Sequence, residues 1–122
     1  MIEKKCSVYV VEDDRSVLDS LTLLLESVGY QSRGFTSAEE LLESGAIQNA
    51  CCLILDIELP GMSGFQLQEV LVASHTAVPV IFITGHDLPA MEGQALRLGA
   101  IAYLRKPFDD RALLTALQPC RK

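Results

Sequence analysis

The sequence predicts an α/β fold: a doubly wound parallel sheet of five strands in the order 2-1-3-4-5, covered by helices on both faces. Short apolar runs alternate with stretches whose apolar residues recur at helical spacing, and this β-α unit occurs five times. The run at residues 51–55 is apolar throughout, as expected for a central strand that is buried on both faces. We therefore expect residues 1–122 to form a single domain with right-handed crossovers.

The first two β-α units occupy the N-terminal third of the chain. Residues 7–11 are a β-branched and aromatic run. Apolar side chains then recur at helical spacing over residues 17–28, and the glycine at position 29 ends the helix. Residues 30–35 predict a more polar strand at a sheet edge. Ser37, with a glutamate three residues later, forms a capping box for a short helix over residues 38–43.

The third unit follows a loop at residues 45–50 and contains the central strand. Turn residues at 60–64 come after that strand, and Ser63 is placed to cap a helix that extends to about Ala73.

The last two units are shorter. Residues 80–83 predict a strand, and the helix after it, over residues 89–98, is weakened by Gly93, which costs roughly 1 kcal/mol relative to alanine. Residues 102–104 form the last predicted strand. An aspartate at 109 or 110 caps a final helix, which a proline at position 119 ends.

A polar cluster follows four of the five predicted strands. The carboxyl ends of parallel strands meet at one edge of a sheet, and ligands bind there where the strand order reverses, between the first and third strands. We therefore expect these clusters to form one site. They are Glu12-Asp13-Asp14, Asp56, Thr84-Gly85 and Lys106-Pro107.

The carboxylates of Glu12, Asp13 and Asp56 predict a metal site. Two unit charges about 4 Å apart repel by roughly 4 kcal/mol at an effective dielectric near 20, and a hard cation bound through oxygen relieves that repulsion. Mg²⁺ fits because it accepts one or two carboxylates together with phosphate oxygens. The alternative is that the acidic run 12–14 only caps the first helix.

Asp56 is a candidate nucleophile, because a carboxylate can form an aspartyl phosphate. Phosphoryl transfer needs positioning and neutralisation of the equatorial oxygens. Mg²⁺ would serve one oxygen, Lys106 a second, and the Thr84 hydroxyl with backbone N–H groups a third, while Gly85 leaves room for the donor. The alternative for Asp56 is an ordinary turn-forming residue.

Composition excludes several classes of function. A net charge of −6 and a pI near 4.8 argue against direct nucleic-acid binding by this domain. No apolar run is long enough to cross a membrane and no signal peptide is present, so we expect a cytoplasmic protein. The cysteines follow no metal-site spacing, and we expect small buried residues in a reducing compartment, with redox sensing as the alternative. They are Cys6, Cys51, Cys52 and Cys120.

The motifs resemble the receiver domain of bacterial response regulators, the CheY-like phosphoacceptor half of two-component systems, which has a flavodoxin-like fold. The resemblance covers about residues 7–117 and is carried by VVEDD at 10–14, LDIELPGMSG at 55–64 and YLRKPF at 103–108. FITGH at 82–86 is further similar to the FixJ-like branch, as is KPFDD, which begins at Lys106. That branch usually carries a C-terminal helix-turn-helix domain.

The resemblance implies a role for each site residue. A sensor histidine kinase would phosphorylate Asp56 in a Mg²⁺-dependent reaction, and the domain would assist its own phosphoryl transfer and dephosphorylation rather than act as an enzyme on other substrates. Lys106 would bind the phosphoryl group, and the peptide bond between Lys106 and Pro107 would be cis. The Mg²⁺ ligands would be Asp13 directly, Glu12 through water, Asp56, and the backbone carbonyl of Glu58.

Thr84 and Tyr103 would form the switch pair that transmits phosphorylation. We expect the face built from residues 89–98, residues 102–104 and the last helix to change shape and to support a phosphorylation-dependent homodimer. Transcription would then be controlled through a DNA-binding domain outside this chain, and we expect residues 118–122 to begin a linker to it.

Three departures from the family pattern and three rival functions accompany this interpretation. Glu12 stands where aspartate is commoner, Glu58 places an acid beside the site, and Gly93 interrupts the fourth helix.

A haloacid-dehalogenase phosphatase needs an aspartate at position 58 and a longer chain. A flavodoxin-like electron carrier needs a hydroxyl-rich loop at residues 12–14, and a degenerate receiver would lack the intact site.

Overall fold

Five parallel strands form one sheet in the order β2-β1-β3-β4-β5, which confirms the predicted topology. The structure is a computed structural model that describes residues 7–120. The strands are β1 (Ser7–Val11), β2 (Gln31–Phe35), β3 (Cys52–Asp56), β4 (Val80–Thr84) and β5 (Ala102–Arg105). The helices are α1 (Arg15–Ser27), α2 (Ala38–Ser44), α3 (Gly64–Ala73), α4 (Met91–Arg97) and α5 (Asp110–Leu117).

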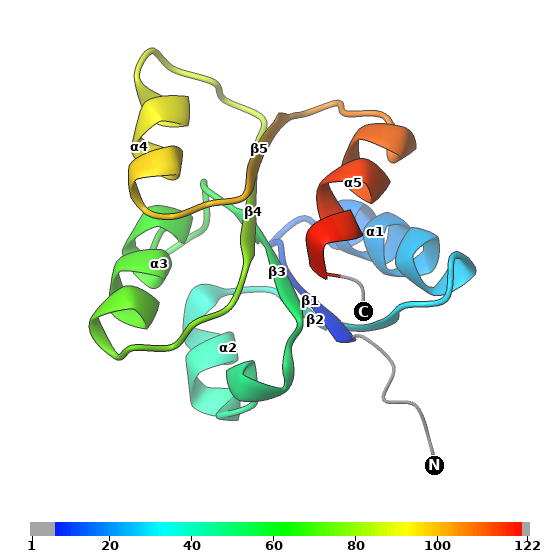
Figure 1. Ribbon diagram of the computed structural model, residues 1–122, viewed down its shortest axis with the longest axis horizontal. Helices are drawn as coiled ribbons and strands as arrows, with labels where there is room; N and C mark the ends of the chain where they lie inside the picture. The colour runs from blue at the N-terminus through cyan, green and yellow to red at the C-terminus, as the bar shows by residue number, and fades with distance from the viewer. Residues whose placement is uncertain (1–6, 121–122) are drawn as a thin grey trace.

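The helices cover the sheet in two layers. α2, α3 and α4 lie on one face, and α1 and α5 lie on the other (Figure 1). The central strand β3 alternates between them, because Leu53 and Leu55 join the core under α2–α4 whereas Cys52 and Ile54 join the core under α1 and α5. All four side chains are fully buried. This double burial explains why the run is apolar at every position.

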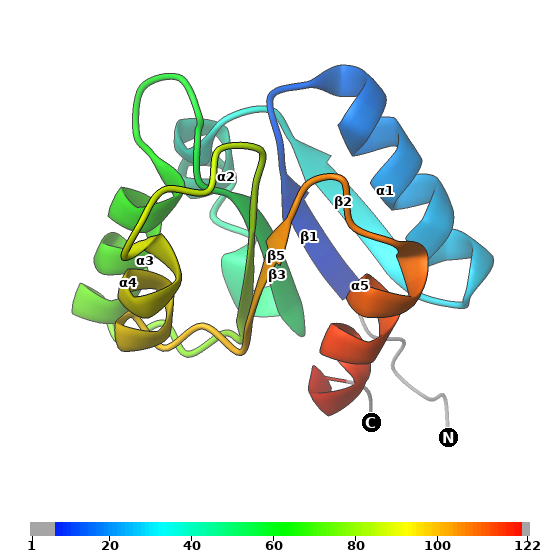
Figure 2. The same cartoon turned by 90° about the horizontal axis from the view of Figure 1, so that it is seen from above.

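The strand register brings the functional segments to one edge of the sheet. Val11 pairs with Leu55, Asp56 pairs with Ile83, and Thr84 pairs with Arg105. Strands β1, β3, β4 and β5 therefore end at nearly the same level. The loops that follow β1, β3 and β5 lie together at that edge (Figure 2).

The helix starts are set by side-chain caps. The Asp14 carboxylate accepts hydrogen bonds from the backbone N–H groups of Ser16 and Val17 at the start of α1. Ser63 and Gln66 form a reciprocal capping box at the start of α3. Asp109 caps α5, which decides between the two aspartates that the sequence left open.

Several strand and helix ends differ from the prediction by one residue, and three differences are larger. α4 begins at Met91 rather than at position 89, because Ala90 has a left-handed backbone with φ 72°, and the helix passes through Gly93 without a break. The loop at 45–50 contains a short 3-10 helix, Ile47–Asn49. A second 3-10 helix, Gln118–Cys120, continues beyond α5 and spans the proline that was expected to end the helix.

The cysteines only partly follow the prediction of buried thiols. Cys52 and Cys120 are buried in the core beneath α1 and α5, as expected. Cys51, however, is disulfide-bonded, so it is not a small apolar thiol. Cys6 lies outside the described residues. Among the described helices, none is long and apolar enough to cross a bilayer.

Candidate functional site

Three carboxylates converge where the sheet order reverses. Glu12 directly follows β1 and is held by a hydrogen bond from its backbone N–H to the Phe35 carbonyl, while Asp56 is the last residue of β3. Each of Glu12, Asp13 and Asp56 offers an oxygen within 4.8 Å of the others. Glu12 and Asp56 are buried and Asp13 is exposed, so two of the three carboxylates lie beneath the surface and one reaches solvent.

Lys106 lies between the two buried carboxylates. Its Nζ donates to Glu12 Oε1 over 2.6 Å and to Asp56 Oδ2 over 3.2 Å. The backbone N–H of Lys106 donates to the Thr84 carbonyl over 2.7 Å, and the peptide to Pro107 is cis. The ammonium group therefore offsets part of the repulsion that the acidic cluster creates.

Burial and proximity shift the pKa values of the two buried carboxylates in opposite directions. Burial raises the pKa of Asp56 to about 7, and the neighbouring Glu12 adds to the increase. Burial alone would raise the pKa of Glu12 too, but hydrogen bonds with Asp56 and Lys106 outweigh burial and hold it below its usual range. The proton is therefore held more firmly on Asp56 than on Glu12. For Lys106, burial is again outweighed, by the hydrogen bond to Glu12 and the charge of Asp56, and its pKa is raised.

Glu58 connects Asp56 with Thr84, a contact that the sequence did not predict. The Thr84 hydroxyl donates to the Glu58 carboxylate, with both oxygens 2.8 Å away. The Gly85 backbone N–H also points to Glu58 Oε1, over 3.3 Å. On the other side, the Glu58 backbone N–H donates to Asp56 Oδ1 over 3.1 Å. Glu58 therefore borders the site with its side chain as well as with its backbone.

Tyr103 belongs to a separate polar network on the α4–β5 side. Its hydroxyl donates to Asp87 Oδ1 over 2.5 Å, and Arg105 Nε pairs with the other oxygen of Asp87. Arg105 also reaches Glu92 Oε1 over 3.1 Å. Burial, and then the bond to Asp87, raise the pKa of Tyr103 to about 12. Sequence reasoning missed this network because a loop aspartate such as Asp87 has no spacing that ties it to a strand 16 residues away.

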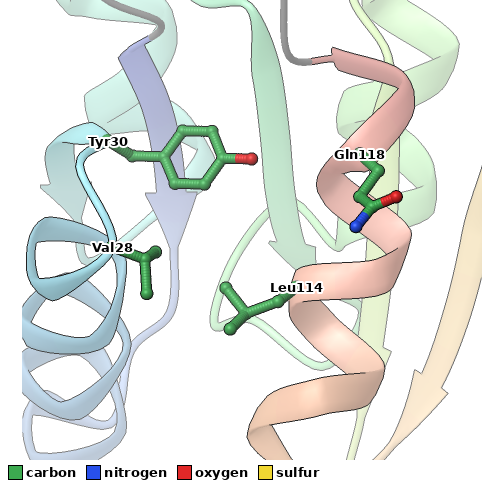
Figure 3. A pocket seen from close by; sticks show the side chains of 4 residues that line it. All are labelled: Val28, Tyr30, Leu114 and Gln118. Carbon is green, nitrogen blue, oxygen red and sulfur yellow. The ribbon is translucent and has the colours of Figure 1, made fainter.

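Two cavities lie beside α1. One, of about 590 Å³, opens next to Lys106 and Gly85 and is walled by apolar side chains of α1 and by Phe108. The other, of about 470 Å³, lies at the opposite end of the sheet, where Tyr30 and Val28 face Leu114 and Gln118 (Figure 3). The first cavity is bordered by Lys106, which contacts the buried carboxylates, whereas the second is not.

The structure brings most of the predicted site residues together. Lys106 contacts Glu12 and Asp56, and these two share the acidic cluster with Asp13. Thr84 reaches this group through Glu58, whereas Tyr103 lies in the network with Asp87. Chemically, the site offers an oxygen-only ligand set, one buried carboxylate with a raised pKa, one cation and one hydroxyl.

Comparisons with known proteins agree with this arrangement. Residues 8–118 match the family model for the response regulator receiver domain. Nodulation protein W of Bradyrhizobium diazoefficiens is 46% identical over 114 residues, which are 93% of this chain and 50% of that protein. The chain spans about half the length of the curated relatives it matches.

Solved structures show the same relationship. The response regulator StyR superposes with a TM-score of 0.89 at 42% identity, covering 97% of this chain and 60% of that one. The crystal structure of FixJ-N superposes with a TM-score of 0.86 at 30% identity, covering 97% of this chain and 94% of that one.

Proposed function

The chain belongs to the receiver domain family of two-component response regulators, and we propose from that membership that Asp56 accepts a phosphoryl group from a sensor histidine kinase. The observation that supports this most is the position of Asp56. It is a buried carboxylate at the end of the central strand, 3.2 Å from the Lys106 ammonium and beside two further acids.

The residues around Asp56 fit a magnesium ion. Glu12, Asp13 and Asp56 supply carboxylate oxygens, and the Glu58 carbonyl lies in the loop after β3, two residues beyond Asp56. A hard cation that prefers oxygen ligands matches this set, and a soft metal does not. When bound, Mg²⁺ supplies charge neutralisation for the phosphoryl oxygens.

Two side chains of this domain would act directly at the phosphorus centre: Asp56 as nucleophile and Lys106 as a cation beside the phosphoryl oxygens. An oxygen of ionised Asp56 attacks phosphorus, the new O–P bond forms, and the bond from phosphorus to the donor nitrogen or oxygen breaks with its electron pair leaving on the donor. Lys106 lies in position to neutralise a second phosphoryl oxygen. The cavity beside Lys106 and Gly85 gives a donor access. In the reverse direction, a water oxygen would attack phosphorus, the Asp56 O–P bond would break with its electron pair returning to the carboxylate, and inorganic phosphate would leave. The domain would in this way assist its own dephosphorylation.

The output side of the proposal concerns association. Phosphorylation would draw the Thr84 hydroxyl toward the phosphoryl group and rearrange the Tyr103 network, and the domain would then form a homodimer through the α4–β5–α5 face. Exposed apolar side chains on and beside α4 support this choice of face: Leu88, Leu96 and Ile101. The dimer would control transcription through a DNA-binding domain outside this chain.

Phosphorylation by a small acyl phosphate tests the proposal. Intact-protein mass spectrometry should show one added phosphoryl group when acetyl phosphate and Mg²⁺ are present and none when Mg²⁺ is chelated. Asp56→Asn should stay unmodified, whereas Asp19→Asn, which changes an exposed aspartate on α1, should react like the wild type. Equal labelling of wild type and Asp56→Asn would refute the assignment.

A further inference from the structure

Glu58 holds the two donors that a phosphoryl group on Asp56 would need. Its carboxylate accepts the Thr84 hydroxyl over 2.8 Å and the Gly85 N–H over 3.3 Å. Thr84 is fully buried, so no water competes for its hydroxyl from the core side. Charge-assisted hydrogen bonds of this kind are about twice as strong as neutral ones.

We propose that the Glu58 side chain is an internal competitor of the phosphoryl group: it occupies the Thr84 and Gly85 donors in the unmodified domain and must leave them when Asp56 is phosphorylated. This inference rests on the proposed function and adds a specific antagonist to it. The competition is local, because Glu58 is tied to Asp56 through its own backbone N–H at 3.1 Å.

Charge strengthens the competition. A phosphoryl group on Asp56 adds negative charge next to a carboxylate that already borders the site, and like charges repel. The phosphoryl oxygens and the Glu58 oxygens are also acceptors only, so neither can donate to the other. Both effects favour displacement of Glu58 over coexistence.

The same displacement would set the threshold of the switch. While the Thr84 hydroxyl donates to Glu58, a move toward Asp56 would break an existing hydrogen bond. Once the carboxylate has left, Thr84 and Gly85 become available to the phosphoryl group. The free energy of breaking the Glu58 contacts is therefore subtracted from the free energy of phosphoryl binding.

Beryllofluoride, which binds an aspartate noncovalently as a phosphoryl analogue, tests the competition. The analogue concentration at half-saturation is measured by calorimetry at saturating Mg²⁺ for wild type, Glu58→Gln and Glu58→Ala. Glu58→Ala should bind at least about tenfold more tightly, equivalent to one hydrogen bond of roughly 1.4 kcal/mol. Glu58→Gln should lie between, because it loses the charge but keeps an acceptor.

A double-mutant cycle separates competition from a general effect of charge. In the Thr84→Ala background the principal donor is absent, so the gain from Glu58→Ala should shrink. Glu69→Gln, which removes an exposed acid on α3, should bind like the wild type. Thermal melts without the analogue identify any variant that fails to fold. If one Glu58 variant is unfolded, the other is compared with the wild type.

The outcomes distinguish the two proposals. If the wild type binds no beryllofluoride, the proposed function is wrong. If the wild type binds it, and both Glu58 variants bind no more tightly or gain equally in the Thr84→Ala background, then the competition is refuted and the phosphoacceptor function stands.

Discussion

The Tyr103 hydroxyl donates a 2.5 Å hydrogen bond to Asp87, and this contact joins the strand β5 to the loop after β4. Asp87 also pairs with Arg105, which follows Tyr103 by two residues on the exposed part of the same strand. Tyr103 is therefore buried, and its hydroxyl is bonded to a carboxylate rather than to solvent. Its position depends on a carboxylate that the family resemblance did not identify.

We expect Asp87→Asn to lower the pKa of Tyr103 from about 12. Burial would still raise it, but the negative charge that disfavours the tyrosinate would be absent. Ultraviolet titration of tyrosinate absorbance measures this, with Tyr103→Phe as the control that identifies the Tyr103 contribution among the three tyrosines. An unchanged titration would show that Asp87 does not hold the hydroxyl in solution.

Without Mg²⁺, the folded state should lose stability as the pH rises through 7. The pKa of Asp56 is raised by burial from 3.8 to about 7, so the folded state keeps a proton that the unfolded chain has released. That contribution is fully present below the unfolded pKa and is lost as the pH rises through the folded pKa. Urea unfolding in a chelator should show a loss of the order of 1–3 kcal/mol between pH 5 and pH 8.

Asp56→Asn should remove most of this pH dependence, since an amide does not titrate. The lowered pKa of Glu12 acts in the opposite direction, but at lower pH, because that contribution is lost only as the pH falls through the folded value. A slope that persists in Asp56→Asn would assign the pH dependence to another group.

Mg²⁺ should raise the melting temperature, because an ion that binds only the folded state stabilises it by linkage. At about 100 times the dissociation constant the gain is roughly 2.7 kcal/mol. Asp13→Ala should shrink the shift, because Asp13 is the exposed member of the acidic cluster and has no other described role. Differential scanning fluorimetry in a Mg²⁺ series measures it. Identical shifts in both proteins would exclude Asp13 from the metal site.

Gly64→Ala should destabilise the domain by roughly 1–3 kcal/mol through overpacking. A Cβ at this position would lie 2.4 Å from the Asp56 carbonyl oxygen, which the backbone cannot accommodate without a shift of the strand end. Gly93→Ala is the matched control. It meets nothing closer than 3.4 Å in α4 and should stabilise that helix by about 0.5–1 kcal/mol. Chemical unfolding measures whether each substitution lowers or raises the free energy of unfolding.

Beryllofluoride with Mg²⁺ should drive association that depends on Leu96. This side chain is 57% exposed on α4, and Leu96→Glu should block dimer formation in sedimentation without weakening analogue binding. Leu23→Glu, at a leucine that is 70% exposed on α1, is the control and should leave association intact. If only Leu23→Glu loses association, the interface lies on α1 instead. Wherever the interface lies, Thr84→Ala should abolish the association that beryllofluoride induces.

The alternation of strand and helix patterns was sufficient to determine the fold from the sequence. An apolar run such as residues 52–55 has few alternatives to a doubly covered strand, and parallel strands necessarily place Asp56, Thr84 and Lys106 at one edge. The local capping signal at Ser63 was readable because its partner lies three residues away, whereas two adjacent aspartates left the α5 cap open until the structure showed Asp109.

Only the tertiary structure decided which side chains touch. Lys106 meets Glu12 across 94 residues of sequence, and Thr84 meets Glu58 across 26, so no periodicity or spacing reports either contact. The left-handed backbone at Ala90, which delays α4, depends on the loop it closes rather than on local propensity. Sequence patterns determine where a side chain stands along the chain, whereas the distances between carboxylate, hydroxyl and ammonium arise when the strands are brought into register.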